Sequence, residues 1–578
     1  MRIQQAVLIL GTLTWLGCDV SMGQLSTTDA GVSPMNDASV FVPGSDGGSI
    51  VPPGLDAWSG TDAGTMESPD AAAVVVPSTC GATALAEPMR GMALYFADCA
   101  EGAEVGCVAG NDAAPGTSPD APRRTVSGLD LDALPAGTQL LFARGGAWSG
   151  MRLAVRNENA TASAPLVMAA YTPSWGGSAR PWIRVTEGTA LELGGYTSSA
   201  PTAHGGYLVE GLHLDGEHAA SWGFWVRDGA EDVVIRDCEI DGFEIGIHFG
   251  GPMRTIERFS IVSNHIHHNS QMGLLGYADD LLIESNRIER NNETGSGLHH
   301  GIYLGGHGQR LRARNNVLAY NSVVGGRCTG GNFTMHGHWE GAVIEGNTIL
   351  QDVSDDGCFG FSITPSYFPE QGSEYFRGFV LRGNTVVNTG SCAFCLGAAP
   401  GVVIESNVVV SNRSVWSAAV SIPAIDPGEG DVRDEGATIR NNTFYWSAPA
   451  ATPVLQLGNA GAGLTVVSNL VFFPDASGGS RFLDASDAQL AMAATNLVHG
   501  AAWSRTHATL PDAQAAGLDL GGMADDPQLV TMPTADNGWD VTLAEGSPAV
   551  DRGHATASAT TDRSCGTRVV PDIGASDR

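Results

Sequence analysis

Histidine and tyrosine side chains concentrate in one short stretch, Leu298 to Gly308, which reads LHHGIYLGGHG. Imidazole and phenol groups can both give and take protons in a reaction. We therefore treat His299, His300 and Tyr303 as candidate catalytic residues. If the stretch is a strand, His299 shares the side of Tyr303, and His300 lies on the opposite side unless the preceding bend turns it. Alternation alone leaves open which histidine faces a substrate.

The same short pattern of glycine and alternating apolar residues occurs elsewhere, around His248 in GIHF and before His336 in NFTMH. A recurring pattern indicates a recurring structural element, in which equivalent positions stack on one another. We therefore add His248 and His336 to the candidate catalytic residues. Whether they meet the first stretch depends on the element that repeats.

A six-residue phrase, apolar-x-x-Asn-x-apolar, recurs along the chain, for example as IVSNHI, IESNRI and LRGNTV. Its asparagines follow one another at intervals of 22 to 37 residues, which is typical of a solenoid with loops of variable length. Around them, aliphatic residues alternate with polar ones, the period of a strand with one buried face. An asparagine tolerates the left-handed conformation of a bend, and stacked asparagines can bond from coil to coil. The asparagines are Asn264, Asn286, Asn316, Asn347, Asn384, Asn407, Asn442, Asn469 and Asn496.

These repeats resemble the right-handed parallel β-helix of the pectate-lyase-like superfamily, especially its secreted bacterial lipoproteins. The stretches GNDAAPGTSPDAPRRTV and LPAGTQLLFARGGAW resemble the segment that leads into the coils, and GSPAVDRG with PDIGA resembles the closing segment. The resemblance implies an all-β solenoid over residues 89–578, with a leading segment at about 89–200, coils at about 201–500 and a closing segment at about 501–578. This fold serves several activities, so it does not by itself define one.

In this superfamily substrates usually lie across the outer face of the first strand of each coil. Aligning the coils on the asparagine phrase identifies that strand as GFWV, GIHF, GLLG, GIYL, NFTM, GFSI and AFCL. Alternation predicts an inward row of Phe224, Ile247, Leu274, Ile302, Phe333, Phe361 and Phe394. It predicts an outward row of Trp225, His248, Leu275, Tyr303, Thr334, Ser362 and Cys395, followed two residues on by positions that include Arg227, Tyr277 and His336.

Because neighbouring coils lie about 4.8 Å apart, His248, Tyr277, Tyr303 and His336 are expected to form one patch about three coils wide, the size of a sugar. Trp225 and the tyrosines could stack on sugar rings. The remaining candidate substrate-binding residues are charged: Arg227, Arg327, Asp355 and Asp356. The last three come from the loops SVVGGRCTGG and QDVSDDGCF, and loops on a rigid scaffold often carry function.

Three functions are compatible with this patch. A polysaccharide lyase needs a base beside a uronate carboxylate and a cation for the developing charge. The chain has no lysine, which excludes the lysine base of some β-helix lyases. The base would then come from a His/Tyr pair such as His248 or His300 with Tyr303, assisted by Arg227 or Arg327. We favour this extracellular lyase-type activity over hydrolysis.

A glycoside hydrolase needs two carboxylates. The stretches SDDGC and GGHG resemble parts of polygalacturonases, but the histidine precedes the aspartates here, opposite to that family's order. The third function is that of a non-catalytic surface lipoprotein, an adhesin that binds glycans or other cells through the same patch. Enzyme and adhesin stay open as alternatives.

A second polar set follows the asparagine corner, with His213, Glu239, His265 and Arg287 in register. Alternating charge on an exposed strand usually forms a solvated face that prevents edge association. We favour that interpretation over a metal site, although histidines two residues apart, such as His265 and His267, can share a metal. No loop has the spacing of an EF-hand. We therefore expect no metal and no cofactor, and the sequence gives no support for calcium.

The composition limits which classes of molecule the protein is expected to bind and indicates disulfide bonds. With Lys+Arg 30 against Asp+Glu 62, the net charge is -32, which disfavours nucleic acid and, globally, other polyanions as partners, although a local arginine cluster could still bind one. The expected partner, a polysaccharide, follows from the resemblance and the patch. Ten cysteines in an exported chain favour disulfides, with Cys99–Cys107 and bridges among Cys328, Cys358 and Cys392 as candidates. A redox role for the CAFC stretch at Cys392–Cys395 is disfavoured because no βαβ pattern surrounds it.

The N-terminus has the pattern of an export signal. One arginine precedes an apolar run too short to span a membrane, and WLGC resembles a bacterial lipobox that would lipidate Cys18. Residues 19–88 are acidic and rich in Gly, Ser, Pro and Ala, which predicts a disordered stalk. We expect residues 1–18 to be a signal peptide and the protein to be a monomer that is lipid-anchored at the cell surface, on the outer membrane.

Overall fold

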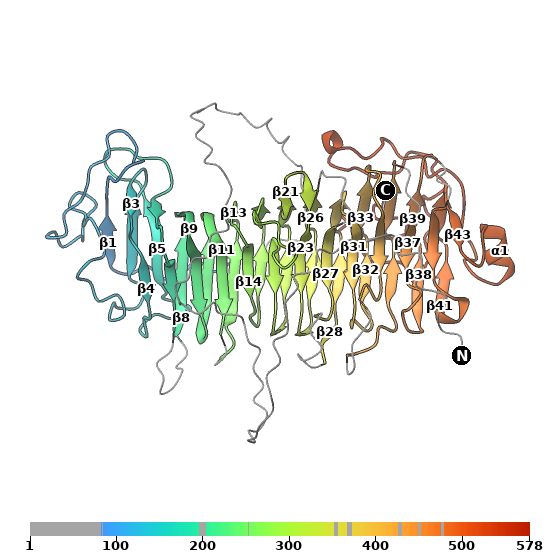
Figure 1. The fold of residues 1–578 in the computed structure, drawn as a ribbon, viewed down its shortest axis with the longest axis horizontal. Coiled ribbons are helices and arrows are strands. Elements are labelled where there is room, and N and C mark those ends of the chain that lie inside the picture. Colours follow the sequence, from blue (N-terminus) through green and yellow to red (C-terminus); the bar gives the residue numbers. More distant parts are fainter. Residues whose placement is uncertain are drawn as a thin grey trace, which may run out of the picture. The chain divides into compact units, whose positions relative to one another are not determined.

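Short parallel strands are the main regular elements of the chain that the structure describes. The computed structural model describes residue 83 and residues 85–195, 204–251, 254–351, 357–366, 373–425, 431–448, 452–475 and 479–577. The described residues belong to one compact unit, 48–578. In it the coils stack along one axis in the order of the sequence (Figure 1). The predicted all-β solenoid is confirmed as a parallel β-helix, whereas Cys18, the signal peptide and nearly all of the stalk lie outside the described residues.

One face of the solenoid is a 14-stranded parallel sheet, here called the corner sheet because its strands lead into the asparagine corners. An aliphatic residue at the centre of many of these strands, such as Ile283, Ile344 and Ile404, is fully buried and stacks on its neighbours. The strands, in spatial order, are β1 (Ala93–Phe96), β2 (Gln139–Ala143), β5 (Leu166–Tyr171), β8 (His204–Glu210), β10 (Ala230–Arg236), β12 (Glu257–Val262), β15 (Leu282–Glu284), β19 (Arg312–Arg314), β25 (Val343–Glu345), β29 (Val380–Arg382), β32 (Val403–Glu405), β35 (Thr438–Arg440), β38 (Leu464–Val467) and β41 (Leu490–Ala494).

A second ladder follows each asparagine corner. Its central residues point inward and are buried, as Ile240, Ile266 and Ile288 are. It consists of β3 (Ala147–Ser149), β6 (Trp182–Arg184), the first part of β9 (His213–Arg227), the first part of β11 (Glu239–Gly250), β13 (His265–His267), β16 (Arg287–Glu289), β20 (Val317–Ala319), β26 (Thr348–Leu350), β30 (Thr385–Val387), β33 (Val408–Ser411), β36 (Thr443–Trp446), β39 (Leu470–Phe472) and β42 (Leu497–His499).

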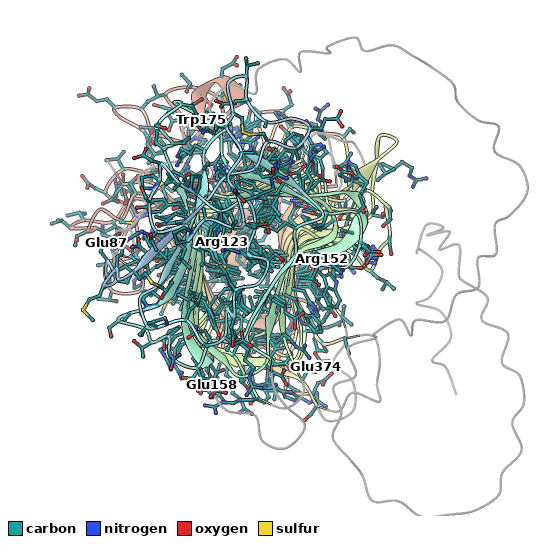
Figure 2. All side chains as sticks on the ribbon, turned by 90° about the vertical axis from the view of Figure 1, so that its left-hand side faces the viewer. Glu87, Arg123, Arg152, Glu158, Trp175 and Glu374 are labelled. Carbon is teal, nitrogen blue, oxygen red and sulfur yellow. A yellow bond between two sulfur atoms is a disulfide. The ribbon has the colours of Figure 1, made fainter. Side chains whose placement is uncertain are left out.

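A third ladder completes each coil and contains the strand on which the sequence places the candidate site. It consists of β4 (Leu153–Val155), β7 (Thr189–Leu193), the second parts of β9 and β11, β14 (Met272–Gly276), β17 (Ile302–Leu304), β23 (Gly330–Met335), β27 (Cys358–Ile363), β31 (Ser391–Leu396), β34 (Ser417–Ser421), β37 (Pro453–Gln456), β40 (Arg481–Asp484) and β43 (Ala502–Ser504). Viewed along the axis, side chains from the sheets fill the interior of the coil (Figure 2). Each fully buried aliphatic side chain there contributes about 1.5–3 kcal/mol.

The corner asparagines form one continuous hydrogen-bonded ladder, as predicted. The Oδ1 atom of each accepts the backbone N–H and the Nδ2–H of the preceding asparagine at 2.9–3.1 Å, from Asn264 to Asn496. Asp519 caps the ladder. The left-handed residue is the one before the asparagine, such as Ser285 at φ 57°, so our assignment of that conformation to the asparagine is wrong.

The described strands begin earlier than the predicted start of the coils at residue 201, because β1 to β7 already pair in parallel. At the other end, the closing segment packs against the outside of the second ladder. There Trp539, Val541 and Ile573 bury the apolar outer residues of its later strands, for example Val408 and Phe472. The earlier strands of that ladder have polar outer residues instead, which this segment leaves uncovered.

Short strands, one short helix, two 3-10 turns and disulfide bonds accompany the three ladders among the described residues. They are β18 (His307–Gln309), β24 (His338–Glu340), β28 (Tyr375–Arg377), the hairpin β21 (Val323–Val324) with β22 (Arg327–Cys328), α1 (Leu510–Ala515), and the 3-10 turns η2 (Asp487–Gln489) and η3 (Ala535–Asn537). The bonds Cys99–Cys107 and Cys328–Cys358 confirm two predicted bridges, Cys392 pairs with Cys395, and Cys238 is buried and free. Among the described residues, the structure contains no helix long and apolar enough to cross a membrane.

Candidate active site

The third ladder aligns the predicted rows as the sequence analysis expects. His248 pairs with Trp225 and Leu275, and Leu275 pairs with Tyr303. Every residue of the predicted inward row, from Phe224 to Phe394, is buried. In the outward row Thr334, Ser362 and Cys395 are also buried, so they are not accessible to a ligand. The accessible candidates are therefore concentrated between β9 and β23.

Tyr303 lies between two histidine rings. Its ring centroid is 5.5 Å from that of His300, with the planes nearly parallel at 5°, and 5.4 Å from that of His336. Tyr303 comes from β17, His300 from the turn that precedes β17, and His336 from the residue after β23. The phenol of Tyr303 makes no hydrogen bond with another described residue. We call Tyr303, His300 and His336 the His–Tyr cluster.

The turn that carries His300 is held by buried polar groups. The Nδ2 atom of Asn292 donates to the carbonyl of His299 at 2.9 Å, and the N–H of Gly331 donates to Nδ1 of His300 at 2.9 Å. Because Nδ1 accepts, the proton of the neutral ring is on Nε2. Burial lowers the pKa of His300 to about 3, since only 4% of the residue is exposed. His300 is therefore a neutral hydrogen-bond donor.

His336 has the opposite tautomer. Its Nδ1 lies 2.7 Å from the carbonyl oxygen of Thr364, which can only accept, so Nδ1 carries the proton and Nε2 keeps its lone pair. Burial lowers the pKa of His336, while the Thr364 carbonyl and the Glu374 carboxylate oppose the change. His336 is therefore neutral near pH 7 and offers a basic nitrogen.

Glu374 was not identified from the sequence. It is 3% exposed, its Oε2 accepts the N–H of Gly337 at 2.6 Å, and its own N–H donates to Asp431 at 2.7 Å. Burial, with a smaller effect of the Glu374 charge, raises the pKa of Tyr303 to about 12. The phenol is thus a neutral proton donor over the physiological range. No local motif marks Glu374, which directly precedes β28.

His299, although adjacent in sequence, has other partners. Its Nδ1 lies 3.0 Å from Oγ1 of Thr294, within the same loop, and burial lowers its pKa. His299 is half-buried, whereas His300 is inside the cluster. Alternation placed His300 on the side opposite Tyr303 unless the preceding bend turned it, and the stacking of its ring on Tyr303 shows that the bend brings it to the same side.

His248 belongs to a separate aromatic cluster. The ring centroids of Trp222 and His248 are 4.7 Å apart, and those of Trp225 and His248 are 6.3 Å apart. Its Nδ1 is buried without a hydrogen bond, and burial lowers the pKa of His248 to about 4. Leu275 stands between His248 and Tyr303 in the ladder, a separation of about 9.6 Å for two strand spacings. The predicted single patch is thus two clusters.

Tyr277 does not join either cluster, and its prediction as an outward stacking residue is wrong. It is 8% exposed and packs in the core, where its hydroxyl donates to the carbonyl of Gly251 at 2.6 Å. The preceding Gly276 has φ 154° and lies so close to Phe249 that no side chain would fit. This glycine conformation breaks the strand alternation, and the next side chain turns inward.

The charged candidates are dispersed. The guanidinium of Arg227 lies 4.2 Å from the Trp225 ring centroid and pairs with Glu192 at 2.7 Å, so it supports the aromatic cluster. Arg327 is exposed on the β21–β22 hairpin. Asp355 and Asp356 lie outside the described residues. Arg227 therefore belongs to the aromatic cluster around Trp225 and not to the His–Tyr cluster.

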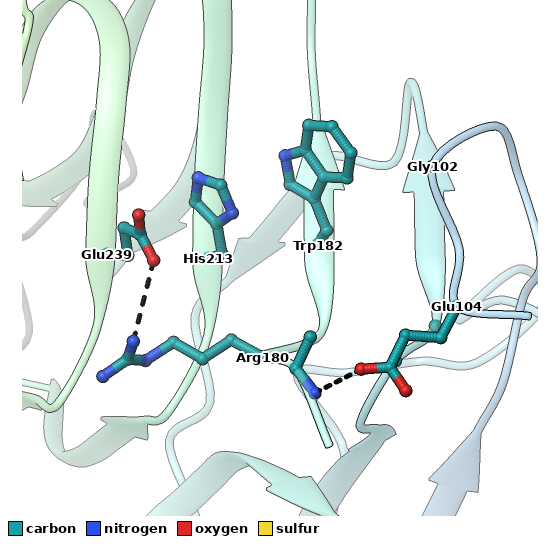
Figure 3. A pocket seen from close by; sticks show the side chains of 9 residues that line it. Gly102, Glu104, Arg180, Trp182, His213 and Glu239 are labelled. Carbon is teal, nitrogen blue, oxygen red and sulfur yellow. Dashed lines mark hydrogen bonds and ion pairs between the residues drawn. The ribbon is translucent and has the colours of Figure 1, made fainter. Parts of the chain in front are cut away.

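A cavity of about 410 Å³ opens on the second ladder, away from both clusters (Figure 3). Trp182, Arg180 and Glu104, none of them identified from the sequence, line it together with His213 and Glu239. The Trp182 and His213 rings are stacked with centroids 5.6 Å apart. A tryptophan beside polar groups was detectable in the sequence, but its strand lay in the segment that we took to precede the coils.

The outer residues of the second ladder pair diagonally between strands. Nε2 of His213 lies 2.7 Å from Asp241, and Nε2 of His265 lies 2.8 Å from Glu289. The neighbouring His267 is the main cause that lowers the pKa of Glu239 to about 2. These contacts fit the predicted polar face, but they also bring Glu239, His265 and His267 together.

Comparisons with known proteins agree with the fold. A family model described as the right handed beta helix region matches residues 217–349, which form consecutive coils here. No similarity to a curated protein was found. These matches leave the chemistry to be argued from the chain's own residues.

Solved structures with similarity include three carbohydrate-active proteins. The GH136 lacto-N-biosidase from Eubacterium ramulus shares 14% identity at a TM-score of 0.39, over 60% of this chain and 67% of that one. Pectate lyase Pel9A shares 14% identity at a TM-score of 0.36, over 85% of this chain and 97% of that one. A mutant of the PL6 family alginate lyase AlyGC shares 13% identity at a TM-score of 0.43, over 77% of this chain but only 56% of that one.

Proposed function

We propose that the protein binds an acidic polysaccharide on the outer face of the third ladder and cleaves it by β-elimination at the His–Tyr cluster. One observation carries this proposal: a neutral tyrosine lies between a histidine that keeps a free Nε2 lone pair and a histidine that keeps an Nε2 proton. Elimination beside a uronate carboxylate needs one base, one acid and one donor to the carboxylate. The three side chains supply these three roles.

In this mechanism Nε2 of His336 takes the proton next to the uronate carboxylate. The electron pair of that C–H bond forms the new carbon–carbon double bond, and the bond to the glycosidic oxygen breaks. Tyr303 gives its phenolic proton to the leaving oxygen, which balances the proton taken by His336. Nε2–H of His300 donates to the substrate carboxylate, where negative charge develops. Glu374 supports the base, because its charge favours protonated His336.

The protonation states favour this assignment. Burial keeps both histidines neutral, and it raises the pKa of Tyr303 to about 12, so the phenol holds its proton until the reaction. Hydrolysis has less support, because it needs two carboxylates, whereas Glu374 is the one carboxylate that we find beside the cluster among the described residues. Asp355 and Asp356 lie outside them.

Glycan binding without cleavage is the second candidate function. The cluster of Trp222, Trp225 and His248, with Arg227 over one ring, favours it, because aromatic faces stack on sugar rings in any glycan-binding protein. The same cluster would serve an enzyme as a subsite two strands from Tyr303. We place either activity outside the cell, on a monomer anchored through Cys18.

The purified protein should be incubated with uronate-containing and neutral polysaccharides, and both ultraviolet absorbance from unsaturated ends and reducing sugar should be followed. Elimination predicts new absorbance, reduced about 10²–10⁴-fold in Tyr303→Phe and in His336→Gln. His499→Gln, on the far end of the second ladder, is the matched control and should retain full activity. Binding without any product would favour the adhesin, and reducing sugar without absorbance would favour hydrolysis.

A further inference from the structure

Three potential metal ligands converge on the second ladder, away from the His–Tyr cluster. Glu239 pairs in register with His265 across β11 and β13, and His267 follows two residues later on the same face. Each of the three offers a ligand atom, and these atoms lie within 4.8 Å of one another. The closing segment covers the apolar outer residues of the later strands, beginning at Val317, and leaves this polar part uncovered.

The two imidazole rings lean toward each other more than the strand requires. Residues two apart on a strand are separated by about 6.6 Å, whereas the ring centroids of His265 and His267 are 3.9 Å apart. Nε2 of His267 is buried and has no hydrogen-bond partner, and its nearest carboxylate oxygen, Oε1 of Glu239, is 3.6 Å away. A buried nitrogen without a partner is costly unless something binds it.

The other polar atom of each ligand is already engaged. Nε2 of His265 bonds to Glu289, which leaves Nδ1, and Nδ1 of His267 bonds to His268, which leaves Nε2. Oε2 of Glu239 lies 3.6 Å from Arg180, which leaves Oε1 (Figure 3). Carboxylate-to-histidine contacts behind the ligands are typical of metal sites, because they fix the ring orientation.

Glu289 is itself rigidly held. The guanidinium of Arg287 donates to both of its oxygens at 2.6 Å, and His265 approaches Oε1 at 2.8 Å. The orientation of the His265 ring therefore depends on an anchored carboxylate rather than on a mobile surface side chain. Such support distinguishes this cluster from a chance grouping of polar residues on a solvated face.

We propose that Glu239, His265 and His267 bind a divalent transition metal, zinc foremost. Two imidazole nitrogens and one carboxylate oxygen are the donor set that zinc shares with other borderline metals, whereas calcium and magnesium prefer oxygen alone. Three protein ligands leave a fourth position for water or an anionic group. Glu239 also lines the cavity beside Trp182, so the metal would lie at the edge of that cavity. This proposal differs from our expectation of a purely solvated face and does not depend on the proposed elimination.

The test is a calorimetric titration, in which Zn²⁺ alone is added to the chelator-treated full-length protein. We expect one equivalent to bind, at least about 100-fold more weakly in His267→Gln and about 10–100-fold more weakly in Glu289→Gln, which leaves all three ligands in place. His499→Gln, on the same ladder, whose ring lies 3.1 Å from the carbonyl oxygen of Ala524 in the closing segment, should bind as the unmodified protein does. Co²⁺ should give the absorption of a four-coordinate site.

Folding is checked separately by circular dichroism without metal, where His267→Gln and Glu289→Gln should match the unmodified protein. Zn²⁺ should then raise the melting temperature of the unmodified protein and of His499→Gln, but not that of His267→Gln. Unchanged affinity in both His267→Gln and Glu289→Gln would refute the site, as would the absence of one-equivalent binding in the unmodified protein.

Discussion

Replacement of His300 by asparagine should change how stability depends on pH. The folded protein holds His300 with a pKa of about 3, against about 6.5 in the unfolded chain. Between these values the unfolded state binds a proton that the folded state excludes, so the stability that His300 contributes above pH 6.5 is lost as the pH falls. Asparagine keeps an acceptor near Nδ1 for the N–H of Gly331 but does not titrate.

The size of the effect follows from the shift. Each pKa unit corresponds to 1.36 kcal/mol, so going from about pH 7.5 to about pH 5 should cost the unmodified protein about 2 kcal/mol through His300 alone. His248, whose pKa is lowered to about 4, contributes equally to both proteins and cancels from the difference. The stability difference between His300→Asn and the unmodified protein should therefore shrink by about 2 kcal/mol in acid.

The assay is urea unfolding followed by tryptophan fluorescence at both pH values, with the free energy taken from midpoint and slope. The overall cost of His300→Asn does not matter, because only its pH dependence carries the argument. A difference that stays constant from about pH 7.5 to about pH 5 would refute the conclusion that His300 is buried and neutral. It would also remove the basis for its role as an Nε2–H donor.

Three further predictions address the ladder, the core and the base. Asn316→Ala should lower the free energy of unfolding by about 2–6 kcal/mol. It leaves the carbonyl of Ile283 and the N–H of Asn286 without their hydrogen-bond partner, at about 1–3 kcal/mol each. An unchanged urea midpoint would contradict the stabilising role of the asparagine ladder. Tyr277→Phe should cost about 1 kcal/mol through its lost hydroxyl bond without changing glycan affinity, and weaker glycan binding would contradict its burial. Glu374→Gln should move both limbs of the pH profile of kcat/KM to lower pH, because the charge of Glu374 raises the pKa of His336 and of Tyr303. A profile with unchanged limbs would exclude this influence of Glu374 on the two pKa values.

The alignment of the coils was predictable because two periods agree. The asparagine phrase fixes where each coil turns, and the two-residue alternation fixes which face each side chain occupies, so Tyr303 and Leu275 were paired correctly. Alternation did not decide the side of His300, because the preceding bend stacks its ring on Tyr303. It failed at Tyr277, where the conformation of Gly276 depends on a close contact with Phe249 in the neighbouring coil.

The sites themselves depend on contacts that no local pattern contains. Glu374 is linked to the His–Tyr cluster through the N–H of Gly337, the residue after His336, and the tautomers depend on Gly331 and Thr364. The spacing of His265 and His267 predicted a shared face. Whether their rings converge depends on rotamers, and these are set by Glu289 in the next strand.

The central claim is that Tyr303 and His336 perform an elimination, and the most direct test is the mass of the new chain ends formed in heavy-oxygen water. Elimination predicts unsaturated ends that are lighter by one water than hydrolysis products, with no heavy oxygen incorporated, and their formation should be lost in Tyr303→Phe and His336→Gln. Heavy oxygen in the new ends, or no cleavage of any uronate-containing polysaccharide, would contradict the account.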